Sequence, residues 1–455
     1  MVRFSDMQAD TIFIQEPPTT GRTGCADGSA FSFIVRKGTT NANRVLIDFM
    51  GGGACWGERC LESSSIQVQS LSGIFAFVGM LDGQNTAFAQ SLFSNFGSGP
   101  LGFGTDISDI NTWTYVFVPY CTQDIHLGTC DVTYTSASSG EQRYIRHNGA
   151  ANVKSVMDWV HESFPAPDSL AFVGCSAGAS AVIVTEAARA AVHYAGAGTT
   201  VVAVGDSPSN LMTEKFAREG LINWGIGSVL EEATGWSNAT DHLGENLLSD
   251  AMSAVFSRHP TVQFAFYTRT ADETQLFQYQ TMGGMVDDLS DSDAMEVWNR
   301  QNLAMLEGLQ SEHSNFRIFV ADGPGHCGMT FDSAITVDGF KDWVEALLLR
   351  GTSGGASTSS IDPPNITCGS QCDPCIPHCN GCQCTCLTPL VIRLCIFNSD
   401  YPSMVHFSQV LCLELLGVMV KSAQPYSKIA VGSVLVTGAH AHSCKAGFLW
   451  TNVRG

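Results

Sequence analysis

The chain lacks any long uninterrupted apolar run, which argues against a membrane-spanning helix. No window approaches the ~18 apolar residues that such a helix needs. The longest candidate near the C-terminus, residues 410–420, is too short and contains Glu414. The first 20 residues also lack a basic segment followed by an apolar one, so no signal peptide is seen in this chain.

Basic residues are scarce, and this scarcity makes nucleic acid an unfavourable partner. Lysine and arginine number 23 against 43 aspartates and glutamates, which gives a formal net charge of −20. A surface this acidic repels nucleic-acid phosphates and anionic membranes. It also fits poorly with a strongly anionic polymer, unless basic residues gather locally.

Cysteine, by contrast, is abundant, with 17 residues. This density is unusual for a cytosolic enzyme and typical of secreted proteins. Two N-x-S/T sequons, at Asn238 and Asn365, add weight to a secretory history. We therefore expect an extracellular, disulfide-bonded glycoprotein.

Spacing along the chain allows two disulfides in the first half. Cys55 and Cys60 could bridge one loop, and Cys121 and Cys130 another. Connectivity does not follow from a single sequence, so both pairings are hypotheses. Cys175 is expected to be a small buried hydrophobic residue and not a nucleophile.

Apolar runs and helical spacing alternate along residues 1–350, which predicts an α/β fold in one catalytic domain. Helical periodicity is clear in residues 148–164, 297–309 and 332–349. This alternation favours a mostly parallel sheet with helices on both faces. The expected strands are residues 30–35, 44–49, 114–119, 170–173, 200–204, 262–267 and 316–320.

Beyond residue 350 the composition changes three times. Residues 351–367 are rich in glycine, serine and proline, which indicates a linker. Residues 368–386 hold seven cysteines, which favours a small disulfide-bonded segment, while their Cys-x-x-Cys spacings leave zinc binding open. Residues 387–455 have no clear caps or repeat. They are either a folded appendage or the translation of an unspliced or shifted reading frame.

The segment 171–178, Ala-Phe-Val-Gly-Cys-Ser-Ala-Gly, carries the strongest chemical signal. An apolar run leads into Gly-x-Ser-x-Gly, and an alanine-rich helical stretch follows. Strand, sharp turn and helix are the context of a nucleophile elbow, which raises a serine hydroxyl above a sheet. Gly174 and Gly178 suit the tight turn because they have no side chains. The pattern predicts Ser176 as a catalytic nucleophile.

A serine nucleophile needs a base and an acid that orients the base. In α/β-hydrolases the chain order is serine, then aspartate or glutamate, then histidine. His326, on a Gly-Pro-Gly loop after the last expected strand, is the expected base. Asp272, two strands past the nucleophile, is the expected acid, with Asp206 and Asp322 as alternatives. Asp206 is also a candidate for the wall of the substrate pocket.

Three consecutive glycines, Gly51, Gly52 and Gly53, follow the second expected strand and suggest an oxyanion hole. Their bare backbone permits a close approach to a substrate oxygen. One N–H donor should come from Ala177, directly after the nucleophile, and the other from Gly52 or Gly53. Trp56, just beyond this loop, is a second candidate for the pocket wall. This chemistry needs no metal and no organic cofactor.

Six short motifs lie along residues 20–350: Cys25-Ala-Asp-Gly-Ser, Gly51-Gly-Gly-Ala-Cys-Trp56, Val118-Pro-Tyr-Cys-Thr, His147-Asn-Gly-Ala-Ala-Asn152, Gly174-Cys-Ser-Ala-Gly178 and His326-Cys. In this combination the chain resembles the pectin acetylesterase/Notum family of α/β-hydrolases. The resemblance implies a carboxylesterase with Ser176, Asp272 and His326 as its triad. Residues after 367 lie outside what the resemblance explains.

The expected function is the removal of O-acetyl groups from a cell-wall polysaccharide, as in pectin acetylesterases. One alternative is a fatty-acyl deacylase or lipid esterase, because the phenylalanine-rich residues 63–104 could wall an apolar pocket. A non-catalytic extracellular binding protein is the alternative of another class. The intact order of serine, aspartate and histidine favours an enzyme over a binding protein.

Overall fold

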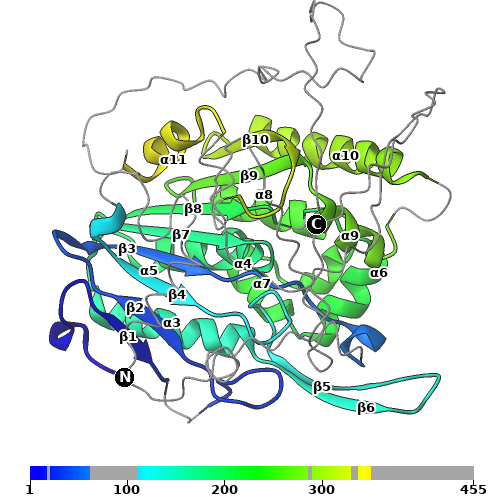
Figure 1. The fold of residues 1–455 in the computed structure, drawn as a ribbon, viewed down its shortest axis with the longest axis horizontal. Helices are drawn as coiled ribbons and strands as arrows, with labels where there is room; N and C mark the ends of the chain where they lie inside the picture. The colour runs from blue at the N-terminus through cyan, green and yellow to red at the C-terminus, as the bar shows by residue number, and fades with distance from the viewer. Residues whose placement is uncertain (18–20, 62–109, 209, 285–288, 329–336, 350–455) are drawn as a thin grey trace, which may run out of the picture. The chain divides into compact units, whose positions relative to one another are not determined.

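One eight-stranded sheet organises the computed structural model, which describes residues 1–17, 21–61, 110–208, 210–284, 289–328 and 337–349. Its strands are β1 (Ile12–Gln15), β2 (Phe33–Arg36), β3 (Asn41–Phe49), β4 (Trp113–Val118), β7 (Ser169–Cys175), β8 (Thr200–Asp206), β9 (Gln263–Ala271) and β10 (Phe316–Pro324). Their order across the sheet is β1-β2-β4-β3-β7-β8-β9-β10 (Figure 1). Neighbours from β4 to β10 run parallel, whereas β1 and β2 join one edge antiparallel.

Continuous apolar runs produce the central strands of this sheet. β7 is buried at all of its positions, as expected for a parallel strand with both faces covered. All seven expected strands are present with shifted ends. Sequence patterning did not predict β1 or the hairpin formed by β5 (Cys130–Thr135) and β6 (Gln142–His147), which projects away from the sheet (Figure 1). Most hairpin residues are polar and exposed, so no apolar run marks them.

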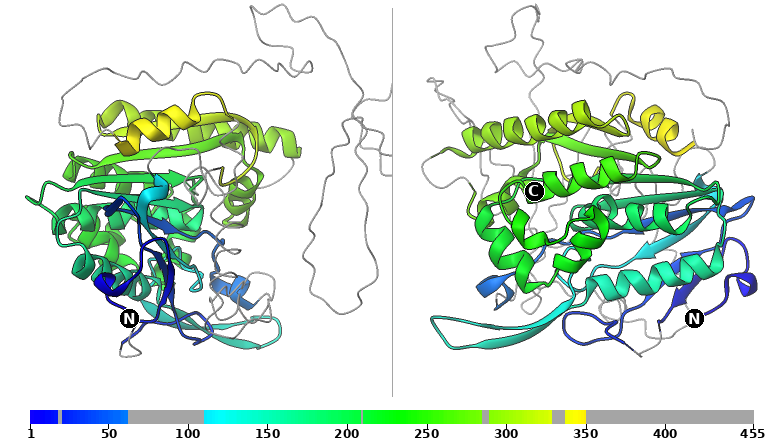
Figure 2. Two further views of the ribbon diagram at one scale, coloured as in Figure 1. Left: turned by 60° about the vertical axis from the view of Figure 1, so that its left-hand side comes forward. Right: turned by 180° about the vertical axis from the view of Figure 1, so that it is seen from behind.

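Helices cover both faces of the sheet, which confirms the predicted α/β-hydrolase-like architecture. They are α3 (Gly149–Ser163), α4 (Ala177–Ala181), α5 (Ala187–His193), α6 (Glu214–Phe216), α7 (Gly227–Thr234), α8 (Leu247–Arg258), α9 (Glu273–Thr281), α10 (Asp291–Glu312) and α11 (Phe340–Leu349). Phe172 of β7 packs in the cluster that includes Val153 of α3. Its neighbour Val173 faces the opposite cluster, with Phe340 and Trp343 of α11. Figure 2 shows the helical layers from two further sides.

Shorter helical turns complete the described chain. They are η1 (Phe4–Asp6), η2 (Gly57–Leu61), η3 (Ile110–Thr112) and η6 (Ala239–His242), with the π-helical turns η4 (Val182–Glu186) and η5 (Ala217–Leu221). The predicted helices 148–164 and 297–309 correspond to α3 and α10, and α11 covers the end of the third. Within the described ranges, no helix combines the length and hydropathy that crossing a bilayer requires.

The described residues all belong to one compact unit, Met1–Ser370. The predicted linker at 351–367, the cysteine-rich segment at 368–386 and the tail at 387–455 lie outside the described residues. The phenylalanine-rich insertion at 63–104 lies outside them as well.

Candidate active site

Ser176 occupies a sharp turn between β7 and α4, as the elbow pattern predicts. Its φ of 53° lies in the left-handed region, which a non-glycine residue adopts only where surrounding contacts hold it. Its backbone N–H donates to the Asp206 carbonyl at 2.8 Å. A Cβ on Gly174 would lie 2.5 Å from the Gly178 backbone, and one on Gly178 would overlap the Phe49 carbonyl. Close packing therefore requires both glycines.

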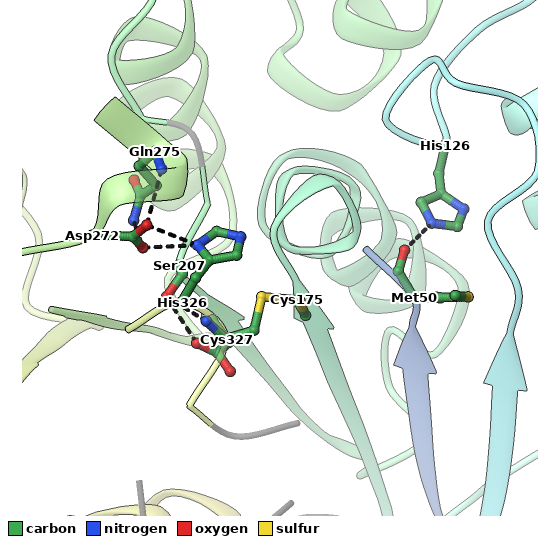
Figure 3. The surroundings of a disulfide bond; sticks show 9 residues. Met50, His126, Cys175, Ser207, Asp272, Gln275, His326 and Cys327 are labelled. Atoms are coloured by element: carbon green, nitrogen blue, oxygen red, sulfur yellow. Dashed lines mark hydrogen bonds and ion pairs between the residues drawn. A yellow bond between two sulfur atoms is a disulfide. The ribbon is translucent and has the colours of Figure 1, made fainter. Parts of the chain in front are cut away.

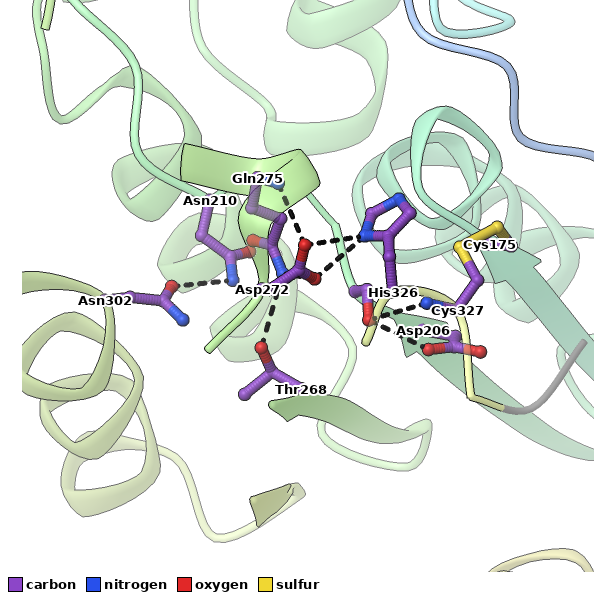
Figure 4. Close-up of polar contacts among 10 residues, drawn as sticks. Cys175, Asp206, Asn210, Thr268, Asp272, Gln275, Asn302, His326 and Cys327 are labelled. Atoms are coloured by element: carbon purple, nitrogen blue, oxygen red, sulfur yellow. Dashed lines mark hydrogen bonds and ion pairs between the residues drawn. A yellow bond between two sulfur atoms is a disulfide. The ribbon is translucent and has the colours of Figure 1, made fainter. Parts of the chain in front are cut away.

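Asp272 and His326, the expected acid and base, are in direct contact (Figure 4). Nδ1 of His326 lies 2.8 Å from Oδ2 and 3.0 Å from Oδ1 of Asp272. Because a carboxylate only accepts, Nδ1 carries a proton, and in the neutral form of the ring the lone pair is then on Nε2. Among the described residues, Nε2 has no hydrogen-bond partner. The imidazole is thus in the tautomer that a general base needs.

The first turn of α9 holds the Asp272 carboxylate in place. This side chain is fully buried, and Oδ1 caps the helix by accepting the backbone N–H of Gln275 at 2.9 Å. The Gln275 amide donates to Oδ2 at 2.8 Å. Sequence reasoning missed Gln275, although Asp-x-x-Gln at 272–275 has the spacing of a capping box. These contacts fix the direction in which the carboxylate faces His326.

The two alternative acids make other contacts. Oδ1 of Asp322 accepts the Thr270 hydroxyl at 2.7 Å and the Gly323 N–H at 2.9 Å, so this exposed residue braces its own loop. Asp206 is 1% exposed and accepts the Ser207 hydroxyl at 3.1 Å, beneath the elbow (Figure 4). Of the three candidate carboxylates, the geometry favours Asp272 as the partner of His326.

A disulfide joins the elbow to the loop that carries His326 (Figure 3). Cys175, directly before Ser176, is bonded to Cys327, directly after His326, and their Cα atoms are 5.4 Å apart. The expected nucleophile and base are therefore each one residue from the same bond. The prediction that Cys175 is simply a small buried hydrophobic residue is wrong. It is buried, but the fold brings it against a cysteine 152 positions away.

Two further disulfides test the predicted pairings. Cys55 bonds to Cys60, as expected. The expected pair of Cys121 and Cys130 is wrong, because Cys121 bonds to Cys25 and Cys130 is a free thiol. A backbone hydrogen bond of 2.8 Å from Ala26 to the Cys121 carbonyl brings the N-terminal segment to this position. The pairing thus depends on a contact between distant parts of the chain.

The glycine loop lies against the elbow. A Cβ on Gly51 would be 2.6 Å from the Cys175 carbonyl, so only glycine allows this approach. Gly53 has a φ of 73°, in the left-handed region that glycine favours. Ala177 begins α4 directly after Ser176. The residues expected to form the oxyanion hole therefore flank the same turn, and their role in binding an oxyanion is a proposal.

Trp56 lies beyond the glycine loop and is largely enclosed. It is 7% exposed and meets the Phe216 ring edge-on, with the ring centroids 4.6 Å apart. The Arg59 guanidinium lies 5.2 Å from the Trp56 ring and 5.9 Å from the ring of Phe277, which is 55% exposed. Trp56 thus packs into the core against the buried Phe216, whereas Phe277 reaches the surface, and the place of Trp56 in a pocket wall is a proposal.

Among the described residues, two groups of side chains have the proximity of metal ligands, with ligand atoms within 4.8 Å of one another. They are Cys55, Cys60 and His147, and Cys175, His326 and Cys327. In both groups the two sulfurs are bonded to each other. A cysteine binds a metal ion as its thiolate, and a disulfide sulfur is not a thiolate. Neither group therefore offers a complete ligand set in this structure.

The imidazole of His126 is hydrogen-bonded to the residue that directly precedes the glycine loop. Its Nε2 lies 2.8 Å from the Met50 carbonyl, directly before Gly51, and therefore donates to it. Burial lowers the pKa of His126 from 6.5 to about 4, against the opposing effects of this hydrogen bond and of the Asp124 charge. The ring is consequently neutral in the folded protein at neutral pH.

We expect this buried histidine to make folding stability decrease in mild acid. The unfolded chain binds a proton near pH 6.5, whereas the folded protein binds it only near pH 4. Stability is therefore lost as pH falls through this window, by on the order of 3 kcal/mol for this group. The His126→Gln variant keeps a donor for Met50 and should lose less stability between these pH values in urea unfolding. Equal losses in both proteins would contradict this prediction.

A known protein-family model matches the part of the chain that contains the elbow. The Pectinacetylesterase family model matches residues 3–231, just over half of the chain. This span includes Ser176 and the glycine loop and ends before Asp272 and His326. No curated protein matches this chain closely enough to be counted as a relative.

Two solved structures of the Wnt deacylase Notum from Drosophila, in two crystal forms, are similar to this chain. Their sequence identities are 15% and 16%, and their TM-scores are 0.48 and 0.47. The alignments cover 73% and 71% of this chain and 89% and 87% of the Notum chains. Since the family model extends over most of the strands that build the sheet and over the elbow itself, the chain belongs to the pectinacetylesterase family.

Proposed function

We propose that this protein is a serine carboxylesterase that removes O-acetyl groups from a cell-wall polysaccharide. The contact between Asp272 and His326 Nδ1, beside the Ser176 elbow, is the observation that carries the proposal. Membership of the pectinacetylesterase family supports the hydrolysis of a carboxylic ester. Ser176 is the nucleophile, His326 the base, and Asp272 the acid that orients the base.

The proposed reaction is a two-step acyl transfer. His326 Nε2 takes the proton from Ser176 Oγ as this oxygen attacks the ester carbonyl. The oxyanion accepts the N–H groups of Ala177 and of Gly52 or Gly53, and losing one such donor typically costs ~2.7–4 kcal/mol of transition-state stabilisation. The sugar hydroxyl leaves with the proton from His326. Water, deprotonated by the same imidazole, then releases acetate from the serine.

The low exposure of the elbow supports a short acyl group. Ser176 is 8% exposed and Ala177 5%, so the expected nucleophile and its neighbour themselves present little accessible surface. With p-nitrophenyl esters of two to twelve carbons, we expect kcat/KM to be highest for acetate. Each extra methylene that finds no room should lower kcat/KM by roughly 10- to 200-fold, which corresponds to about 1–3 kcal/mol.

Two other results would each change the proposal, and a third assay identifies the substrate within it. A preference for eight or more carbons would favour the fatty-acyl alternative. Hydrolysis no faster than that of a Ser176→Ala variant would favour a non-catalytic binding protein. Acetate release from acetylated pectin, compared with other acetylated glycans, identifies the polysaccharide. The excess of acidic residues in this chain would repel polygalacturonate, which is itself anionic. Other acetylated glycans therefore belong in the same assay.

We also propose that the protein is secreted and glycosylated. The described residues hold three disulfides, which form in oxidising compartments. Asn238 of the first sequon is exposed at the start of η6, where Thr240 donates to its side-chain oxygen at 2.7 Å. Detection of a glycosidase-sensitive form in the culture medium checks both points.

A further inference from the structure

The Cys175–Cys327 disulfide connects strands that are not neighbours in the sheet. Ser176 follows β7, and His326 follows β10, while β8 and β9 lie between these two strands. The loop after β10 therefore crosses the ends of two strands to reach the elbow (Figure 3). Hydrogen bonding within the sheet does not by itself set the separation between Ser176 and His326.

Besides the disulfide, hydrogen bonds hold the part of this loop that carries the base. Cys327 N–H donates to the Ser207 hydroxyl at 3.2 Å. An Arg269 N–H donates to the Asp322 carbonyl at 3.3 Å. The His326 ring is hydrogen-bonded to Asp272, which follows β9. This hydrogen bond directs the imidazole but does not connect the loop to β7. Within the described residues, the disulfide is the one covalent link between the loop and the elbow.

The backbone is strained at Cys327 and at Ser176, directly after Cys175. The φ angles of Ser176 and Cys327 are 53° and 57°, and neither residue is glycine. Side chains with a Cβ occupy this region only where the surrounding structure holds them there. The bond between Cys175 and Cys327 acts directly on these two turns. The packing of Gly174 and Gly178 holds the Ser176 turn independently of this bond. Breaking the bond would therefore release chiefly the turn at Cys327, which directly follows His326.

We propose that Cys175 and Cys327 are positioning residues whose disulfide keeps the loop of His326 beside the Ser176 elbow, so that a proton can pass between the two side chains. This inference rests on the proposed function. The esterase is then much less active when this bond is reduced. A dithiol reductant breaks the S–S bond, converts the cysteines to two thiols and is itself oxidised to a disulfide. Asp272 still orients the imidazole afterwards, but the loop is held by hydrogen bonds alone.

The test compares two double variants that each remove one long-range disulfide. Cys175→Ala/Cys327→Ala removes the bond at the site, and Cys25→Ala/Cys121→Ala removes one elsewhere. The two bonds close loops of 152 and 96 residues, so their loss should destabilise the fold to a similar degree. A misplacement of about 1 Å can cost ~100-fold, so we expect kcat of the site variant to fall roughly 10- to 100-fold. Its KM and the kcat of the control should stay near the wild-type values.

The kcat and KM values separate positioning from general stability. A site variant with wild-type kcat, or one whose kcat falls no further than its folded fraction, would overturn the inference. An equal loss in the control variant would overturn it as well. If hydrolysis by the wild-type protein does not depend on Ser176, the proposed function has failed. If hydrolysis depends on Ser176 but not on the disulfide, only this inference has failed.

Reduction of the wild-type protein gives the same answer if the site variant does not fold. The protein is treated with dithiothreitol under native conditions, alkylated with iodoacetamide, and analysed by mass spectrometry for the opened pair. Activity should fall in step with alkylation of Cys175 and Cys327. Without alkylation, it should return on reoxidation with oxidised glutathione. Full activity in folded protein whose Cys175 and Cys327 are reduced would overturn the inference.

Discussion

Replacing Ser176 with alanine should reduce kcat for acetyl-ester hydrolysis by roughly 10⁴- to 10⁶-fold. The variant has no serine hydroxyl to attack the ester carbonyl. His326 can then only activate a water molecule for this attack. The glycine loop and Ala177 remain, and residual catalysis should come from them. Release of p-nitrophenol from the acetyl ester, followed at high enzyme concentration, measures both rates.

Ser180 provides the matched control for this substitution. It lies one turn further along α4 and is 6% exposed, so it tests the same change in a similar environment. Ser180→Ala should keep kcat within about 3-fold of the wild type, since alanine is a good helix former. Similar losses in the two variants would mean that the change damages the elbow and that Ser176 is not the nucleophile.

Replacing Asp272 with asparagine should reduce kcat by about 10⁴-fold. In the wild type, Asp272 Oδ1 caps α9 by accepting the Gln275 N–H at 2.9 Å. Asparagine has nearly the same shape, and its side-chain oxygen can still accept this N–H. Its amide group would then face His326 Nδ1 and donate to it. The ring proton is pushed to Nε2, where it blocks the base. Steady-state kinetics at neutral pH, with unfolding curves for both proteins, measure the effect.

Asp322→Asn is the control for this acid. Asp322 precedes His326 by four residues, and its contacts are with Thr270 and Gly323, not with the imidazole. We expect only a small loss of kcat in this variant. A larger loss from Asp322→Asn than from Asp272→Asn would contradict the assignment. Asp272→Ala should also lose about 1 kcal/mol of folding stability, because alanine cannot cap the helix.

Local sequence was sufficient for the elbow and for most of the sheet. The turn at Ser176 is built by contiguous residues, and its requirement for Gly174 and Gly178 follows from the backbone itself. The central strands are apolar runs buried on both faces, so composition marks them directly. The chain order of Ser176, Asp272 and His326 also follows from counting strands.

Contacts between distant segments could not be derived in the same way. Three aspartates follow strands after the elbow, and only the packing of α9 against the β10 loop brings Asp272, rather than Asp322, against His326. Disulfide partners raise the same difficulty. Cys121 was expected to pair nine residues away with Cys130 and instead pairs with Cys25, 96 residues away.

The sequence by itself therefore determined the nucleophile turn, the parallel strands and the order of the expected triad, because each depends on residues next to one another. The tertiary structure decided which carboxylate meets the imidazole and which sulfur bonds to Cys175. The reason is that loops after separate parallel strands converge at one edge of the sheet. Their separation in space is set by strand order and loop path, and neither has a signature in the local sequence.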